Sequence, residues 1–92
     1  MKTILMKLKV IVNPNPFTSE LSVHIHGSFA INIVIRLTNS KGTVIRIAAC
    51  TLNQGENKVK IGNLQRYAGG NYHLEIKLLN GDLLETLNLV KS

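Results

Sequence analysis

Apolar and polar residues alternate along most of this chain. The apolar rows are, in chain order, Met6, Leu8, Val10 and Val12; Leu21, Val23 and Ile25; Ile31, Ile33, Ile35 and Leu37; Val59 and Ile61; and Tyr72, Leu74, Ile76 and Leu78. A period of two is typical of β-strands with one buried face. No segment combines a period of 3.6 with caps at both ends, so we expect no long helix.

The segment of residues 43–52 is apolar on both faces, so alternation alone does not orient it. We place Ile45 and Ile47 on the inner face because Arg46, between them, belongs in solvent. This predicts a strand that contributes two isoleucines to the core.

Turn-forming residues separate the strand patterns. Residues 39–42 and 53–56 are turn clusters, and residues 62–70 form an irregular connection. Asn80-Gly81 is the strongest short hairpin signal and favours a two-residue type I′ loop. That loop pairs Leu79 with Asp82, Ile76 with Glu85, Leu74 with Leu87 and Tyr72 with Leu89, which keeps the apolar face in register.

Both prolines fall in the run Asn13-Pro14-Asn15-Pro16-Phe17. Proline has no N–H and a fixed φ, so it does not occupy a central strand, and it favours an extended conformation in the residue before it. We therefore predict a stiff, extended crossover between the first two strands. Two interpretations of the run stay open: a purely structural crossover, or a crossover that also serves in recognition.

Six or seven strands at spacings of about 8–12 residues predict two antiparallel sheets packed face to face. The chain has 92 residues with no internal repeat, low-complexity segment or linker, so we expect residues 1–92 to form one domain. Its composition is 45% hydrophobic and 17% charged, which is the balance of a chain that folds.

The net charge of +6 would suit an acidic partner, but the basic residues are scattered along the chain. Proteins that bind single strands stack bases on aromatic side chains. The aromatic residues here are Phe17, Phe29, Tyr67 and Tyr72, and at least two of them belong to the core. We therefore expect no nucleic-acid partner. No apolar stretch approaches ~18 residues, so we also expect no membrane insertion.

The chain has few residues that could bind a metal or act as a reactive thiol. His24 and His26 share one strand face, and with His73, also predicted to point outward, they are the candidate zinc ligands. No fourth ligand or supporting shell is apparent, which favours three exposed histidines instead. Cys50 lies in an apolar run without a Cys-x-x-Cys motif, so we expect a partly buried structural thiol. We predict neither a metal nor a cofactor.

Catalytic constellations are equally sparse. The acidic residues are Glu20, Glu56, Glu75, Asp82 and Glu85, and no two of them look paired as general acid and base. Gly69-Gly70 is not followed by the helix start that a phosphate-binding loop requires. We therefore predict that the chain is not an enzyme.

Several short motifs follow one another in a recognisable order. They are Pro14-Asn15-Pro16-Phe17; Leu21, Val23 and Ile25; Lys41-Gly42-Thr43-Val44; Leu64 with Gly70-Asn71-Tyr72; and the ending Leu89-Val90-Lys91. In this order and spacing, residues 8–92 resemble the C-terminal sorting domain of the type IX secretion system of Bacteroidota. The resemblance implies an immunoglobulin-like β-sandwich of about seven strands.

The resemblance also implies an address rather than a catalyst. Such a domain ends a larger cargo protein and directs it from the periplasm to the cell surface or the medium. The implied partners are the outer-membrane secretion apparatus and a sortase-like peptidase that removes the domain. The recognition candidates are Pro14, Asn15, Pro16, Phe17, Gly70, Tyr72, Val90 and Lys91. For Tyr72 we favour a core role.

The start of the chain bears on how this domain would reach its destination and leaves a second function open. The start of the chain resembles a signal peptide, but Lys7 and Lys9 interrupt its apolar region and no small-residue cleavage site follows, so residues 1–6 are expected to be a strand. We therefore expect a fragment or an excised domain, carried to its destination by a larger cargo protein. The alternative function is a standalone β-sandwich that binds a carbohydrate or a protein.

Overall fold

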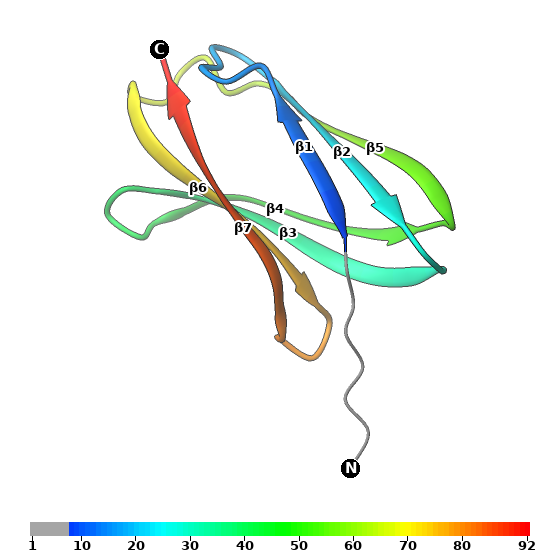
Figure 1. Ribbon diagram of the computed structural model, residues 1–92. Coiled ribbons are helices and arrows are strands. Elements are labelled where there is room, and N and C mark those ends of the chain that lie inside the picture. The colour runs from blue at the N-terminus through cyan, green and yellow to red at the C-terminus, as the bar shows by residue number, and fades with distance from the viewer. Residues whose placement is uncertain (1–7) are drawn as a thin grey trace.

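The computed structural model describes residues 8–92, and this part of the chain forms strands only (Figure 1). The strands are β1 (Lys9–Asn13), β2 (Leu21–Gly27), β3 (Ile31–Asn39), β4 (Val44–Leu52), β5 (Gly55–Ile61), β6 (Gly70–Leu78) and β7 (Leu83–Lys91). The described residues contain no helix of the length and apolar character that crossing a membrane requires. The prediction of an all-β fold is confirmed.

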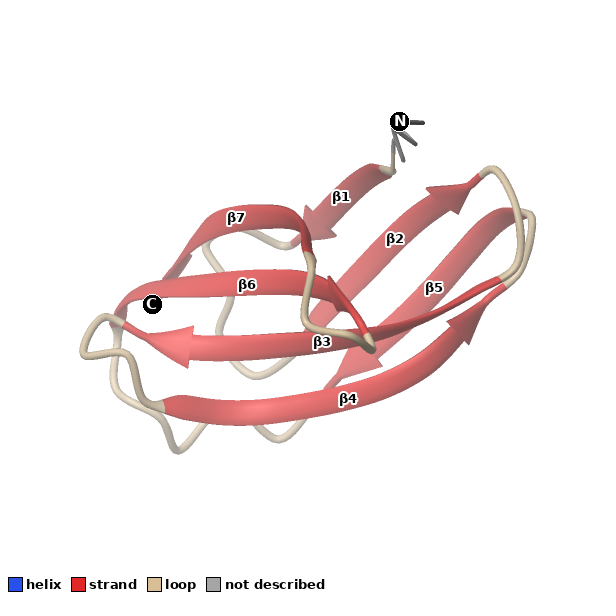
Figure 2. Cartoon of the chain, turned by 90° about the horizontal axis from the view of Figure 1, so that it is seen from below, coloured by secondary structure: helices blue, strands red, loops and turns tan. Residues whose placement is uncertain are grey.

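The seven strands form two antiparallel sheets. One sheet has the strand order β1-β2-β5, and the other has the order β4-β3-β6-β7. The chain passes between the sheets after β2, β4 and β5, and Figure 2 shows the resulting two layers. Because each sheet hides one apolar face against the other, the arrangement is the predicted sandwich.

The core lies between the two sheets and is built mainly from aliphatic side chains. Its buried members are Phe17, Leu21, Val23, Ile25, Ile33, Ile35, Leu37, Leu52, Ile61, Leu64, Tyr72, Leu74, Ile76 and Leu89. Most of them alternate along β2, β3 and β6, as the period of two predicts. Val10 and Val12 of β1, and Leu8 just before it, pack against this core, whereas Met6 and Lys7 lie outside the described residues.

The β6–β7 hairpin differs from its prediction at the loop. Leu78 N donates to Asp82 O (2.9 Å) and Gly81 N donates to Leu78 O (2.9 Å), so the loop has three residues and Leu79 does not pair with Asp82. Gly81 has a φ of +98°, whereas Asn80 has no positive φ, which excludes a type I′ turn.

The body of that hairpin nevertheless has the predicted register. Lys77 pairs with Leu83 and Ile76 with Glu85, so one extra residue, Leu84, bulges from β7. The bulge compensates for the longer loop. Tyr72 faces Leu89 and Leu74 faces Leu87, as predicted.

The orientation predicted for β4 is wrong over half of its length. Leu37 pairs with Arg46 and Thr38 with Val44, so Ile45 is an extra residue and the alternation changes phase there. Ile45 still packs against the core, but Ile47 is 60% exposed. Arg46 shares the inner face with Leu37 at the end of the sandwich, where its guanidinium group reaches backbone carbonyls.

The proline run does not form an extended crossover. It bends at Pro14, Asn15 and Pro16, and both X–Pro peptide bonds in it are cis. It joins β1 to β2, which are antiparallel neighbours in one sheet. The run therefore turns the chain back on itself at the end of the sandwich.

Candidate functional site

The structure brings the eight recognition candidates together at one end of the sandwich. We call this group the terminal junction: Pro14, Asn15, Pro16, Phe17, Gly70, Tyr72, Val90 and Lys91. In Figure 1 the end of β7 lies beside the loop that joins β1 to β2. β6 supplies the remaining members, because Gly70 pairs with Lys91 and Tyr72 with Leu89.

Backbone groups hold the proline run against the last strand. Phe17 N donates to Val90 O (2.9 Å) and Ser92 N donates to Phe17 O (2.9 Å), so Phe17 forms a parallel bridge beside Lys91. Asn15 Oδ1 accepts a hydrogen bond from Val90 N (2.9 Å) across 75 positions of sequence. These three bonds satisfy polar groups at the open edge of β7 and connect the two sheets.

Two aromatic side chains anchor the junction in the core. The rings of Phe17 and Tyr72 meet edge to face, with centroids 5.6 Å apart and planes inclined by 68°. Phe17 is fully buried and Tyr72 is 4% exposed. The Tyr72 hydroxyl donates to Ala68 O, so its one polar group is satisfied inside the structure. The favoured core role of Tyr72 therefore agrees with its position.

Two adjacent glycines bring the β5–β6 connection close to the end of β7. A Cβ on Gly69 would lie 3.2 Å from Lys91 O and from the carbonyl carbon of Ser92, which is tighter than ordinary packing. Gly70 has a φ of +140°, a conformation that side-chain-bearing residues rarely adopt. Both glycines are needed for the backbone to turn into β6 at this place.

The junction divides into an exposed part and a buried part. Pro14, Asn15, Pro16 and Gly70 are exposed, and Val90 is 44% exposed. Phe17, Tyr72 and Lys91 are buried, and Lys91 Nζ donates to Ser92 O (3.4 Å). A partner therefore has access to the bends, to Gly70 and to Val90, whereas the buried residues hold these in place.

A shallow hollow borders the junction. It has a volume of about 280 Å³ and is lined by Asn39, Ser40, Lys41, Ala68, Gly69, Gly70, Asn71 and Tyr72. Most of this lining is polar or glycine. Its size lies just below the usual range of ligand pockets, about 300–1,000 Å³.

The three histidines do not come together. His24 and His26 lie on β2 in the three-stranded sheet, whereas His73 lies on β6 in the four-stranded sheet. His26 Nδ1 lies 2.9 Å from Glu56 Oε1, and His73 Nδ1 lies 2.8 Å from Asn88 Oδ1. The zinc site that would join all three is therefore contradicted, and residues 8–92 contain no other group of three metal-ligating side chains.

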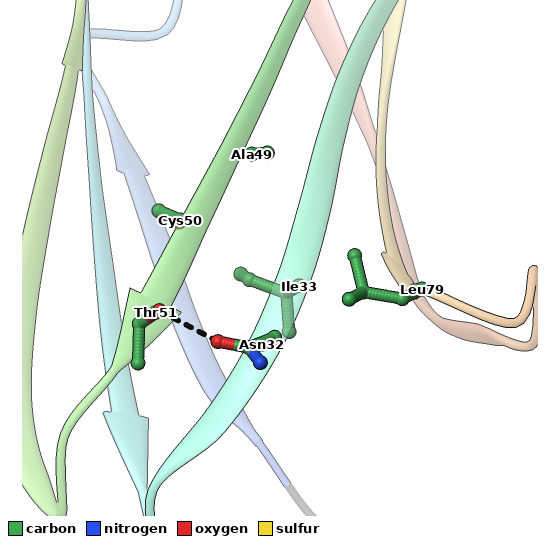
Figure 3. Close-up of a pocket in the computed structure, with 6 residues that line it drawn as sticks. All are labelled: Asn32, Ile33, Ala49, Cys50, Thr51 and Leu79. Atoms are coloured by element: carbon green, nitrogen blue, oxygen red, sulfur yellow. Dashed lines mark hydrogen bonds between the residues drawn. The ribbon is translucent and has the colours of Figure 1, made fainter.

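Cys50 lies in β4 beside a second hollow, of about 190 Å³, drawn in Figure 3. Its lining comprises Asn32, Ile33, Ala49, Cys50, Thr51 and Leu79. Thr51 donates a hydrogen bond to Asn32 Oδ1 (2.6 Å), and no imidazole lines the space. Burial raises the pKa of the half-buried Cys50 thiol, which leaves less thiolate at neutral pH and disfavours a nucleophile.

Sequence reasoning missed several supporting groups of the junction. Ser19 O accepts from Leu64 N (2.9 Å), and Ala68 O accepts from the Tyr72 hydroxyl. These contacts use backbone carbonyls, which every residue type carries, so the sequence offers no signal for them. The inward position of Arg46 was missed for a different reason, because it depends on the bulge at Ile45.

Comparison with known families identifies a match along most of the chain. A family model described as the secretion system C-terminal sorting domain matches residues 11–89. The matched segment reaches from β1 to β7 and contains six members of the terminal junction, while Val90 and Lys91 follow it directly. Comparison with curated proteins gave no match.

Proposed function

The chain belongs to the secretion system C-terminal sorting domain family, and from this we propose that its terminal junction is the surface that the secretion machinery recognises. The family consists of non-catalytic domains that sort cargo proteins for type IX secretion. Cargo that carries such a domain is delivered to the cell surface or secreted.

One observation carries the proposal. The hydrogen bond from Val90 N to Asn15 Oδ1 joins residues 75 positions apart, so exposed parts of two distant motifs form one continuous surface. A partner that binds this surface reads the proline bends and the last strand together. It therefore detects a folded domain, because an unfolded chain would not present the two motifs side by side.

The two partners are proposed to act on different parts of the molecule. We propose that the outer-membrane secretion apparatus binds the exposed part of the junction, and that a sortase-like peptidase cleaves before β1. β1 spans five residues, Lys9–Asn13, and leads directly into the proline run, so its start lies about 17 Å from the junction (Figure 1). A cut before β1 would therefore lie outside the junction, on the strand that leads into it, so the two partners would use different residues.

The test fuses residues 8–92 behind a periplasmic reporter in a type IX-competent cell. Val90→Lys places a charge on the exposed side of the junction, and Leu83→Lys is its matched control. Both side chains are exposed, at 44% and 54%, and both lie on β7, but Leu83 is at the opposite end of the strand. We expect Val90→Lys to lose surface delivery and Leu83→Lys to keep it.

Folding is measured separately for each purified variant by circular dichroism and thermal unfolding. Replacement of Pro14 and Pro16 by alanine provides a second, independent change to the junction. The proposal fails if Val90→Lys is exported like the parent chain. It also fails if export is lost only in variants that have unfolded.

A further inference from the structure

Two arginines and a tyrosine meet at the irregular connection between β5 and β6. Arg46 reaches it from β4: Nη1 donates to Gly62 O (3.1 Å) and Nη2 donates to Asn63 O (3.4 Å). Arg66 and Tyr67 belong to the connection itself, and Tyr67 N donates to Leu64 O (3.1 Å). The bulge at Ile45 makes this meeting possible because it turns Arg46 toward the end of the sandwich.

The Tyr67 side chain lies beside the guanidinium group of Arg66, and Arg46 reaches carbonyls of the same connection. The guanidinium carbon of Arg66 is 5.5 Å from the centre of the Tyr67 ring. Hydrogen bonding and positive charge, from Arg66 first and then from Arg46, lower the pKa of the Tyr67 hydroxyl. Both guanidinium groups therefore lie at the connection that carries Tyr67.

No carboxylate neutralises these cations within residues 8–92. The ion pairs in this part of the chain are Arg36 with Glu75, Lys60 with Glu20, and His26 with Glu56. Arg46 and Arg66 belong to none of them, in a chain whose net charge is +6. Arg46 donates to the carbonyls of Ile45, Gly62 and Asn63, but neither arginine has a carboxylate partner, so an anion at this connection would be stabilised by both positive charges.

We propose that Arg46, Arg66 and Tyr67 form a binding site for a doubly charged oxyanion, namely a phosphate group. Guanidinium forks match the geometry of phosphate oxygens, and the Tyr67 hydroxyl supplies a further donor. Two positive charges match a dianion better than a single carboxylate. This site shares no residue with the terminal junction, so phosphate binding is tested independently of the proposed recognition surface.

The first experiment titrates the folded chain with inorganic phosphate at constant ionic strength, followed by amide chemical shifts of residues 62–69. We expect saturable shifts confined to this connection and to Arg46. Acetate at the same concentrations serves as the singly charged comparison, and we expect it to bind at least tenfold more weakly. Shifts that are identical in phosphate and acetate would overturn the proposal.

A second readout uses the tyrosine itself. The chain contains no tryptophan and two tyrosines, so absorbance at the tyrosinate band follows Tyr67 once the Tyr67→Phe titration is subtracted. Bound phosphate offsets the positive charge around the hydroxyl, and we expect it to move the Tyr67 pKa back toward its ordinary value. An unchanged titration curve would contradict a phosphate group at this place.

Two variants distinguish binding at a specific site from nonspecific attraction to the positive charge of the chain. Arg66→Gln removes an exposed guanidinium, and Lys58→Gln removes one charge from the exposed side of β5. We expect Arg66→Gln to weaken phosphate binding about tenfold or more and Lys58→Gln to leave it unchanged. Equal losses in the two variants would mean nonspecific attraction and would overturn the proposal.

The source of the phosphate group is distinguished by two arms. One arm uses inorganic phosphate, and the other uses vesicles of phosphatidylcholine with or without a phospholipid that carries a phosphomonoester headgroup. Binding that depends on Arg66 in the first arm alone identifies a free phosphate, and Arg66-dependent binding to the phosphomonoester vesicles identifies a lipid-borne one. Absence of Arg66-dependent binding in both arms contradicts the site.

Discussion

At the residue scale, Phe17 and Asn15 of the proline run contact the last strand in different ways. The Phe17 side chain belongs to the core, while its backbone N–H and C=O are bonded to Val90 and Ser92. Asn15 is exposed, and its side-chain oxygen holds the N–H of Val90. Both residues bond to the open edge of the last strand: Phe17 through its backbone while its ring packs in the core, and Asn15 through a side chain that remains accessible to a partner.

Replacement of Asn15 tests this polar contact. Asn15→Ala removes the acceptor of the Val90 N–H, and we expect a loss of about 1 kcal/mol in the free energy of unfolding. Asn15→Asp keeps an acceptor oxygen and is the matched control. Hydrogen exchange of the Val90 amide is the direct measurement: it should accelerate in Asn15→Ala and stay slow in Asn15→Asp. Equal protection in both variants would show that the side chain does not hold β7.

The half-buried thiol of Cys50 gives a dependence of stability on pH. Burial raises its pKa in the folded chain, so folding opposes ionisation of the thiol. The corresponding stability is complete below the unfolded-state pKa, about 8.5, and is lost as the pH rises through the higher folded-state value. We expect the free energy of unfolding of the parent chain to fall relative to Cys50→Ala between pH 7.5 and 10, measured by urea denaturation. A constant difference would contradict this expectation.

At the element scale, the β6–β7 hairpin shows how a correct register can arise from an incorrect loop. The Asn80-Gly81 pair predicted a hairpin, and the apolar face of Tyr72 and Leu74 specified which residues they oppose. The predicted loop type was wrong because the preference of Asn-Gly for hairpin turns does not determine how many residues the loop contains. Leu84 absorbs the difference as a bulge beside the loop and still packs against the core.

The observed loop makes its own prediction. Gly81 has a φ of +98°, so Gly81→Ala should destabilise the chain by about 1 kcal/mol. Asn80 has no positive φ, and its Oδ1 accepts from Asp82 N (2.9 Å). Asn80→Ala meets no positive φ and loses only this exposed hydrogen bond, so it should cost less than Gly81→Ala, whereas a type I′ turn would strain an alanine at both positions. Thermal unfolding of the two variants compares them directly, and similar large losses would favour the type I′ loop.

β4 shows the limit of prediction from alternation. Its residues are apolar on both faces, so the sequence held no internal preference and one charged residue decided the orientation. The deciding rule, that arginine faces solvent, failed because Arg46 lies at the end of the sandwich and its guanidinium reaches the carbonyls of Gly62 and Asn63. A bulge depends on the partner strand, which no local pattern contains.

At the scale of the whole molecule, the sequence predicted the members of the terminal junction but not their contact. The ordered motifs predicted Pro14 to Phe17 and Val90-Lys91 as recognition candidates, and the strand patterns predicted the two sheets that carry them. The bonds that join these segments run mostly between backbone groups, whose chemistry is the same in every residue. Only the folded arrangement shows that the proline run and the end of β7 form one surface.

The four edge strands of the two sheets are protected unequally. β1 is short and carries Lys9, and β5 carries Glu56, Lys58 and Lys60. β7 has a bulge near its start, and Phe17 covers its end. In β4, by contrast, residues 47–52 contain no charge, proline or glycine, and Ile47 is 60% exposed. Such an edge is open to pairing with another chain.

We therefore expect the chain to self-associate through β4 at high concentration, and a single lysine there to suppress it. Ala49 is exposed, so Ala49→Lys adds a charge to this edge without disturbing the core. Thr86→Lys adds the same charge to an exposed position of β7 in the same sheet and is the matched control. Light scattering during concentration and heating should show less association for Ala49→Lys than for Thr86→Lys. If both variants reduce association equally, net charge is responsible and the β4 edge is not the contact, because only Ala49→Lys changes that edge.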